Sequence, residues 1–396
     1  MLQAKTEYGE FVTLASLKRE RISRLKMQNQ FFCPVCDKPV IAKAGSLMVP
    51  HFAHHSKGNC PSHEGGEGVY HEKGKLLLYQ WLVHQHLDVR LEAYLPAINQ
   101  RPDILLNVNN KTIAIEYQCA RIPLSQIISR NEGYYSQGIE PIWILGANRF
   151  NRRGQNHIKI DQFQLQFIHQ FSSDFPLTLY YFCPNTLRFI LFQDFYFLTL
   201  QKAAGRLLIN KLPQMIVTDL FQPAWFQHEQ LWRIWKREKR SFRLKPPGRG
   251  YGREFAWQQW LYVNRLHKET LPAIIHLPVS SQFRMTTPPW NWQSRLCTDI
   301  IAPLENGDAF NLQDCLHFLR QHIRNPQSTP LVKPSICPVY QYLQLLEHMQ
   351  LIQEVTPNVF VKRQTILFFK HVEDALHGES VLMEQMMKQN TGMDHV

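Results

Sequence analysis

Two acidic residues lie in neighbouring apolar runs of the segment RPDILLNVNNKTIAIEYQ, which begins at residue 101. Asp103 belongs to the first run and Glu116 to the second, and Asn109–Asn110 separates them. Asparagine tolerates the positive φ angles of a two-residue hairpin turn, so the segment predicts two antiparallel strands. In that hairpin Asp103 faces Glu116, with Cβ atoms about 4.5 to 5.5 Å apart.

Two facing carboxylates repel each other and require a nearby cation. A divalent Mg²⁺ or Mn²⁺ ion would meet this need, because it takes oxygen ligands from one or two carboxylates and retains water molecules. Such an ion can activate water and stabilise the leaving oxygen of a phosphodiester. Gln118 would share the face of Glu116. The alternative is a solvated sheet face in another register, since a slip of one residue would separate the two acids.

A third acid precedes this hairpin in the segment EGVYHEKGK. Glu67 and His71 are four residues apart, and Lys75 follows after a further turn, so all three would share one helix face. The helix could present an acid, an imidazole and an ammonium group to the sheet. Ordinary surface residues at a helix start are the alternative interpretation.

A cluster of cysteines and histidines precedes the helix. Cys33 and Cys36 form a CxxC pair, and His51, His54 and Cys60 follow. Zn²⁺ binds four sulfur or nitrogen ligands in a tetrahedron, and ligands two or three residues apart fit a tight turn. We therefore expect a structural zinc held by four of these five residues, namely the three cysteines and one histidine. A redox dithiol and a metal-free cluster are the alternatives.

Cations and tryptophans alternate between residues 225 and 262. Cations that follow a phosphate backbone and aromatic faces that stack on bases are typical of single-strand binding. We expect a DNA-binding surface there; the alternative is a helix with buried tryptophans and a solvated basic face. The residues of the expected surface are Arg233, Lys236, Arg237, Lys239, Arg240, Arg243, Trp232 and Trp235.

The elements that must position these residues follow from hydrophobic periodicity. Residues 1–30 predict a hairpin and a basic, helix-prone connector, and residues 31–63 the zinc-finger-like module. Residues 64–150 alternate as helix, strand, strand, helix, strand, which indicates an α/β domain. Residues 151–396 begin with aromatic-rich strands and become mainly helical, and a winged helix near the end is an alternative to plain helical packing.

Composition agrees with a globular, DNA-binding protein. The chain has 396 residues and a formal net charge of +12, which favours a polyanionic partner, with nucleic acid ahead of an anionic membrane surface. No apolar run is long enough to span a membrane, so we expect a cytoplasmic protein. Eight cysteines are too few for a disulfide scaffold.

Read together, these motifs resemble the competence protein CoiA family. The matching segments are HFAHHSKGNC, EGVYHEKGK, RPDILLNVNNKTIAIEYQ and RNEGYYSQGIEPIWILG. The resemblance implies a PD-(D/E)xK nuclease-like core with an N-terminal zinc-binding module and a mainly helical C-terminal domain. It places Asp103, Glu116 and Gln118 in an active site, with Glu67 as the helix-borne acid and His71 and Lys75 beside it.

Gln118 departs from the superfamily pattern, in which lysine is usual. Glutamine cannot supply positive charge at neutral pH, so Lys75 would have to provide it.

The resemblance also implies a function. A metal-dependent deoxyribonuclease would act on incoming DNA, expected to be single-stranded, during natural transformation and recombination. The alternative is a catalytically silent nuclease fold that binds single-stranded DNA and delivers it to recombination proteins. A zinc-stabilised scaffold for partner proteins is a third hypothesis, and the sequence sets no oligomeric state.

Overall fold

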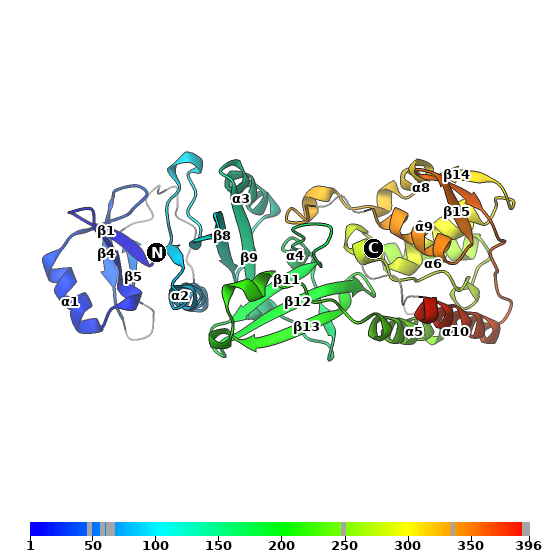
Figure 1. Cartoon of the computed structure of the whole chain (residues 1–396), viewed down its shortest axis with the longest axis horizontal. Helices are drawn as coiled ribbons and strands as arrows, with labels where there is room; N and C mark the ends of the chain where they lie inside the picture. Colours follow the sequence, from blue (N-terminus) through cyan, green and yellow to red (C-terminus); the bar gives the residue numbers. More distant parts are fainter. Residues whose placement is uncertain (46–49, 56–59, 61–67, 247–250, 334–336, 390–396) are drawn as a thin grey trace. The chain divides into compact units, whose positions relative to one another are not determined.

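The computed structural model of this chain describes residues 1–45, 50–55, 60, 68–246, 251–333 and 337–389 (Figure 1). The chain divides into two compact units. The first consists of Met1–Phe150, Leu179–Leu191 and Leu208–Gln222, and the second of Asn151–Thr178, Phe192–Leu207 and Pro223–Val396. Among the described helices, none combines the length and apolar character that crossing a bilayer requires.

The first unit begins with a five-stranded sheet in the order β2-β1-β3-β4-β5. Its strands are β1 (Gln3–Thr6), β2 (Phe11–Thr13), β3 (Phe31–Phe32), β4 (Pro39–Lys43) and β5 (His51–His54), and helix α1 (Arg19–Gln28) joins β2 to β3. The hairpin and helix predicted for residues 1–30 are therefore confirmed. They share a sheet and a small core with β3, β4 and β5, so they and the Cys/His segment form one module.

An α/β layer follows in the first unit. Its elements are α2 (Val69–Val83), β6 (Asp88–Leu91), β7 (Ile104–Val108), β8 (Lys111–Gln118), α3 (Leu124–Ser136) and β9 (Ile139–Gly146). This confirms the predicted order of helix, strand, strand, helix and strand, with β6 as an additional strand. The hairpin register is also as predicted: Val108 pairs with Lys111, and Asn109 and Asn110 have φ angles of 48° and 60°.

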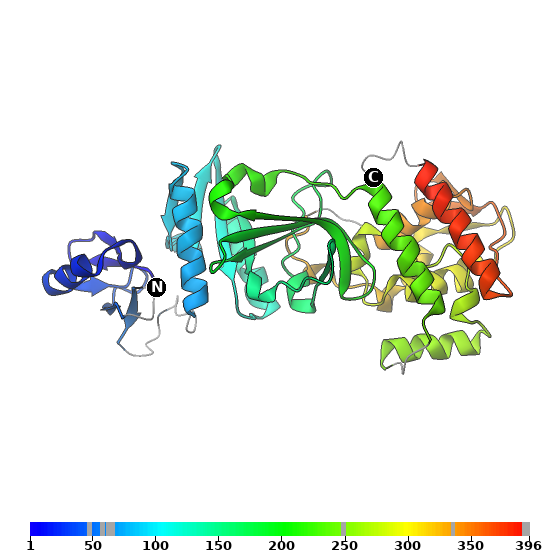
Figure 2. The ribbon, with the colours of Figure 1, turned by 90° about the horizontal axis from the view of Figure 1, so that it is seen from below.

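Helices α2 and α3 cover opposite faces of this sheet (Figure 2). Tyr117 points towards α2, where Gly74 permits close approach, because a Cβ atom there would lie 2.1 Å from the Tyr117 ring. Ala114 packs with Tyr134 of α3. Side chains alternate between the two faces of a strand, so the even-numbered residues of β8, including Glu116, face α3.

The sheet continues past residue 150. β8 and β9 are parallel, and β9 is parallel to β11 (Thr178–Cys183). β12 (Arg188–Phe197), β13 (Lys202–Lys211) and β10 (His157–Lys159) complete eight strands in the order β10-β13-β12-β11-β9-β8-β7-β6. The predicted aromatic-rich strands thus extend the same sheet.

The second unit is mainly helical. It contains α4 (Gln162–Leu165), α5 (His228–Leu244), α6 (Arg253–Val263), α7 (Pro289–Arg295), which continues as a π-helical turn Leu296–Ile301, α8 (Leu312–Phe318), α9 (Pro338–His348) and α10 (Val372–Gln389). Short 3₁₀ turns occupy Leu14–Ser16, Pro96–Ile98, Ala147–Arg149, Leu212–Gln214, Val217–Phe221, Lys268–Thr270, Ser280–Arg284, Arg320–His322 and Pro326–Ser328 in the two units.

The end of the second unit has the topology of a winged helix. β14 (Ala309–Asn311), β15 (Ile352–Thr356) and β16 (Val359–Lys362) form an antiparallel sheet in the order β14-β16-β15, with α8 and α9 between the first two strands. Helix α9 carries no Lys or Arg, and its Gln341 accepts a hydrogen bond from Ser281 N. We therefore assign no DNA-reading role to α9.

Candidate active site and metal-binding module

Asp103 lies one residue before β7, and groups from two elements hold its carboxylate. Oδ2 accepts a 2.9 Å hydrogen bond from Tyr117 N and lies 3.4 Å from His71 Nε2, while Oδ1 lies 3.4 Å from Lys75 Nζ. Burial opposes ionisation, but the positive charges of Lys75 and His71 and the hydrogen bonds from His71 and Tyr117 outweigh it. The pKa of Asp103 is therefore lower than usual.

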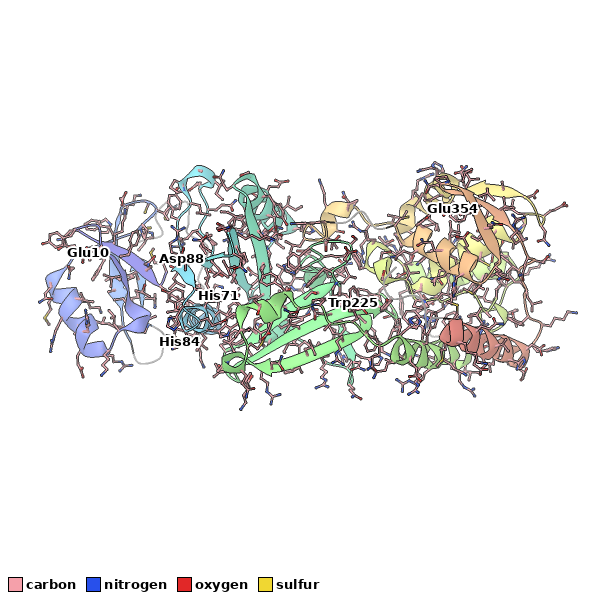
Figure 3. The ribbon with its side chains drawn as sticks, viewed as in Figure 1. Glu10, His71, His84, Asp88, Trp225 and Glu354 are labelled. Atoms are coloured by element: carbon pink, nitrogen blue, oxygen red, sulfur yellow. The ribbon has the colours of Figure 1, made fainter. Side chains whose placement is uncertain are left out.

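His71 (labelled in Figure 3) and Lys75 lie on α2, four residues apart as predicted, and both side chains contact Asp103 of the sheet. The His71 ring stacks on Tyr117 with 5.5 Å between centroids. Lys75 is 1% exposed in its side chain, and its Nζ lies 2.6 Å from Glu92 Oε1. The structure thus brings Asp103, His71 and Lys75 together.

Glu116 is also buried, and its partners come from α3. Arg130 Nη2 donates to Glu116 Oε1 at 2.6 Å, and the Tyr134 hydroxyl donates to the same oxygen. Burial and the Glu116 charge raise the pKa of Tyr134 well above its usual value, so this hydroxyl keeps its proton. Arg130 also lies 5.8 Å from the Trp143 ring centre.

The two acids therefore occupy the predicted register but have different partners. Groups from α2 and the Tyr117 amide surround Asp103, whereas groups from α3 surround Glu116. Asp103 lies outside the strand, so strict alternation of side chains does not fix its direction. In this structure a protein cation lies beside each carboxylate, and binding of one shared metal ion by the two acids stays a prediction.

The remaining residues of the expected site are Gln118 and Glu67. Gln118 ends β8, and its amide donates to Ala120 O at 2.8 Å. Glu67 lies outside the described residues.

Sequence patterns revealed neither Glu92 as a partner of Lys75 nor Arg130 and Tyr134 as partners of Glu116. Glu92 follows β6 with a φ angle of +49° and lies 3.8 Å from Arg101 Nη1. Arg130 and Tyr134 are four residues apart on α3, which was a usable signal for a polar face directed at β8. No local signal pairs Glu92 with Lys75, because a turn of unknown geometry separates them.

The Cys/His cluster assembles as a set of four ligands. One potential ligand atom each from Cys33, Cys36, His54 and Cys60 lies within 4.8 Å of the others. Cys33 Sγ and Cys60 Sγ are 3.9 Å apart, close to the roughly 3.8 Å between two sulfurs of a tetrahedral zinc site with 2.3 Å bonds. Among the residues that the structure describes, this is the only group of three or more such donors that could hold a metal.

The structure also distinguishes the two candidate histidines. His51 and His54 both lie on β5, and an odd separation of three residues directs their side chains to opposite faces of a strand. Only His54 joins the cysteines. Burial raises the pKa of the Cys33 thiol to about 11, so a cation would be needed to hold it as a thiolate at neutral pH.

The expected DNA-binding surface on α5 divides into buried and exposed residues. Trp232, Trp235, Lys239 and Arg243 are at most 2% exposed. Lys239 and Arg243 donate to backbone carbonyls and lie 3.3 and 2.8 Å from Glu379 of α10. Because stacking and phosphate contact require exposed groups, the expected surface narrows to Arg233, Lys236, Arg237 and Arg240.

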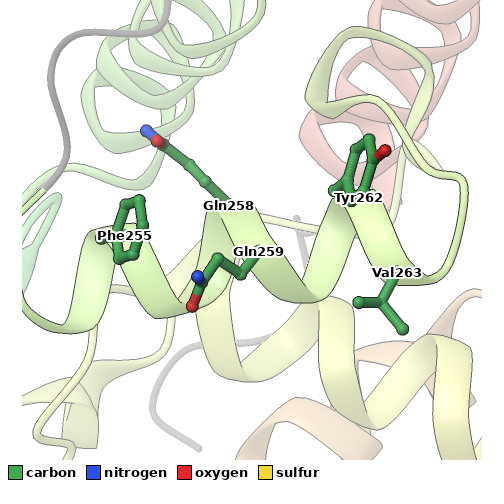
Figure 4. A pocket seen from close by; sticks show the side chains of 5 residues that line it. All are labelled: Phe255, Gln258, Gln259, Tyr262 and Val263. Carbon is green, nitrogen blue, oxygen red and sulfur yellow. The ribbon is translucent and has the colours of Figure 1, made fainter.

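Two further features, a hollow on α6 and the cysteines outside the Cys/His cluster, have no assigned role in the candidate site. A shallow surface hollow on α6 is lined by Phe255, Gln258, Gln259, Tyr262 and Val263 (Figure 4). Among the cysteines outside the Cys/His cluster, Cys297 and Cys315 are buried, whereas Cys119, Cys183 and Cys337 are half-buried.

Comparisons with known proteins cover most of the chain. Residues 14–63, 67–225 and 230–376 match three family models, described as the N-terminal, nuclease-like and C-terminal domains of Competence protein CoiA. Competence protein CoiA of Bacillus subtilis (strain 168) is 35% identical over 180 residues. That match covers 46% of this chain and 46% of the relative, so it spans less than half of the relative's length. No solved structure matches.

Proposed function

Because the chain belongs to the competence protein CoiA family, we propose that it acts on DNA in natural transformation as a Mg²⁺- or Mn²⁺-dependent phosphodiesterase. The core would be of the PD-(D/E)xK type, with Asp103 and Glu116 as its acids. One observation carries the proposal. The β7–β8 register pairs Ile104 with Ile115, so Asp103 and Glu116 each lie one residue beyond this pair, and Asp103 lies beside the buried Lys75 and the half-buried His71.

The donor chemistry fits a hard divalent cation. Asp103 and Glu116 provide carboxylate oxygens from one hairpin, and Mg²⁺ commonly takes one or two carboxylates together with waters. Binding would require the carboxylates to turn from their present cationic partners towards the ion. Once bound, the ion would supply Lewis-acid activation of water and charge neutralisation at the phosphate.

Residues of this chain would perform the remaining steps. Lys75 would supply the positive charge that Gln118 lacks, and its near-complete burial fixes its Nζ beside Asp103. His71 Nε2 would donate to Asp103 and keep this carboxylate oriented. Gln118, at the end of β8, would orient water through its amide group.

A second candidate function also has support from the site. In a catalytically silent nuclease fold, Arg130 and Tyr134 would neutralise Glu116 permanently, and Gln118 would remain bound to Ala120. Such a protein would bind single-stranded DNA and deliver it to recombination proteins. In either function, Zn²⁺ at Cys33, Cys36, His54 and Cys60 would contribute to folding of the N-terminal module.

A cleavage assay separates the two functions. The full chain is incubated with end-labelled single- and double-stranded DNA and with Mg²⁺ or Mn²⁺, beside the variants Asp103→Asn and Glu116→Gln. Glu132→Gln serves as a control, because Glu132 is an exposed acid on α3. Metal-dependent cleavage that both site variants lose supports the enzyme. Tight binding without cleavage by the parent chain supports the silent module.

A further inference from the structure

Glu92 has an unusual conformation for its residue type. It has a φ angle of +49° and is 3% exposed. L-residues rarely adopt left-handed backbone angles, and a buried carboxylate needs partners to offset lost hydration. A residue kept in this state is held by its surroundings, so its contacts identify what it supports.

Two separate contacts connect Glu92 to Asp103. Glu92 N donates to Asp103 O at 3.0 Å, which fixes the backbone just before β7. Glu92 Oε1 accepts from Lys75 Nζ at 2.6 Å, and the same Nζ lies 3.4 Å from Asp103 Oδ1. Removing the Glu92 side chain would therefore remove the nearer of the two carboxylate contacts described here for Lys75.

A third contact connects Glu92 to the Cys/His module. Its Oε2 accepts a 2.9 Å hydrogen bond from Leu2 N, and Leu2 is fully buried. Met1 O accepts a 2.8 Å hydrogen bond from Phe52 N, and Phe52 lies two residues before His54 on β5. A short path thus leads from a candidate metal ligand to Asp103 through Leu2, Glu92 and Lys75.

From these contacts we infer that Glu92 is a positioning residue that couples metal occupancy of the Cys33, Cys36, His54 and Cys60 site to the geometry of Asp103. A bound metal fixes β5, β5 fixes Met1 and Leu2, and the Leu2 amide holds Glu92 against Lys75. This inference deepens the proposed function, because it makes the metal module a support of the candidate active site.

Hydrogen exchange of the Tyr117 amide tests this coupling, because Tyr117 N donates to Asp103 Oδ2. Exchange is measured in the full chain saturated with Zn²⁺ and again after removal of Zn²⁺ with a chelator. We expect removal to accelerate exchange at Tyr117 about tenfold.

Leu2→Pro, which deletes the N–H donor, should show fast exchange at Tyr117 with and without Zn²⁺. Leu2→Ala keeps the donor and removes most of the same side chain, so it should retain the response to Zn²⁺. A second variant, Glu92→Gly, removes the carboxylate and suits the positive φ angle, and it should also abolish the response.

Two results would overturn the inference. One is acceleration confined to residues 1–63 when Zn²⁺ is removed. The other is a response to Zn²⁺ that persists in both Leu2→Pro and Glu92→Gly. The readout is amide exchange, so it decides the coupling even if the cleavage assay shows that the proposed catalytic function is wrong.

Discussion

Replacing Lys75 with methionine should destabilise the candidate active site strongly. Lys75 Nζ lies 2.6 Å from Glu92 Oε1 and 3.4 Å from Asp103 Oδ1, and the side chains of Lys75, Glu92 and Asp103 are 1%, 2% and 12% exposed. Methionine has a similar volume but leaves the buried Glu92 carboxylate and the half-buried Asp103 carboxylate without their shared cation. Removing one partner of a buried ion pair costs about 3 to 5 kcal/mol, and the residual pairing of Asp103 with His71 favours the lower end.

Hydrogen exchange of α2 and β8 measures this destabilisation locally, which avoids assuming two-state unfolding for a chain with two units. A decrease of about 3 kcal/mol in local stability accelerates exchange by about a hundredfold or more, since each 1.4 kcal/mol corresponds to a factor of ten.

The control is Lys73→Met on the same helix. Lys73 is half-buried and donates a hydrogen bond to Asn185, and its replacement should change the exchange rate by only about twofold. The double variant Lys75→Met with Glu92→Gln should recover part of the stability, because it removes one uncompensated charge. A change at Lys75 no larger than that at Lys73 would refute the assignment of a buried charge network.

Three further predictions concern other parts of the chain. Cys36→Ser should reduce the amount of bound Zn²⁺, which atomic emission measures, and should unfold the N-terminal module, which proteolysis detects. Full zinc binding by this variant would exclude Cys36 from the ligand set. Burial and the nearby Arg243 lower the pKa of Lys239 from 10.5 to about 8 despite the charge of Glu379. Between these two pH values the unfolded chain holds a proton that the folded chain has released, so the free energy of unfolding should rise from about pH 8 to about pH 10.5. Urea titrations should show a smaller rise in Lys239→Met, and equal pH slopes in both proteins would contradict this assignment. The four exposed cations of α5 are Arg233, Lys236, Arg237 and Arg240. Replacing them with glutamine should weaken the salt dependence of single-stranded DNA affinity, by about 0.7 in the slope of log affinity against log salt for each phosphate that is no longer neutralised. An unchanged slope would show that DNA binds at another surface.

The fold of the hairpin could be predicted because local chemistry determines it. Asn109 and Asn110 adopt the positive φ angles expected for a two-residue turn, and this turn sets the register of Asp103 and Glu116. The direction of the Asp103 side chain could not be predicted in the same way. It lies just outside β7, where the alternation of strand side chains no longer applies.

The Cys/His ligands could be predicted as a group, and the choice of histidine depended on a strand that the sequence did not locate. Once β5 is known to run from His51 to His54, alternation separates the two rings.

Helix α5 shows how charge can mask a buried face. Trp232, Trp235, Lys239 and Arg243 recur at helical spacing, which is typical of a core-facing stripe. Two of the four are cations, so the stripe resembled a DNA-binding surface. Their partner, Glu379, lies on α10 and is too distant in sequence for any local pattern to identify.

The central claim is that Asp103 and Glu116 together bind a divalent cation, and Mn²⁺ binding tests it most directly. Electron paramagnetic resonance can count Mn²⁺ ions bound to the full chain after its Cys/His site has been saturated with Zn²⁺. We predict an Mn²⁺ site in the parent chain and in Glu132→Gln that is absent from Asp103→Asn and from Glu116→Gln. No bound Mn²⁺ in the parent chain, or the same site in both acid variants, would contradict this claim.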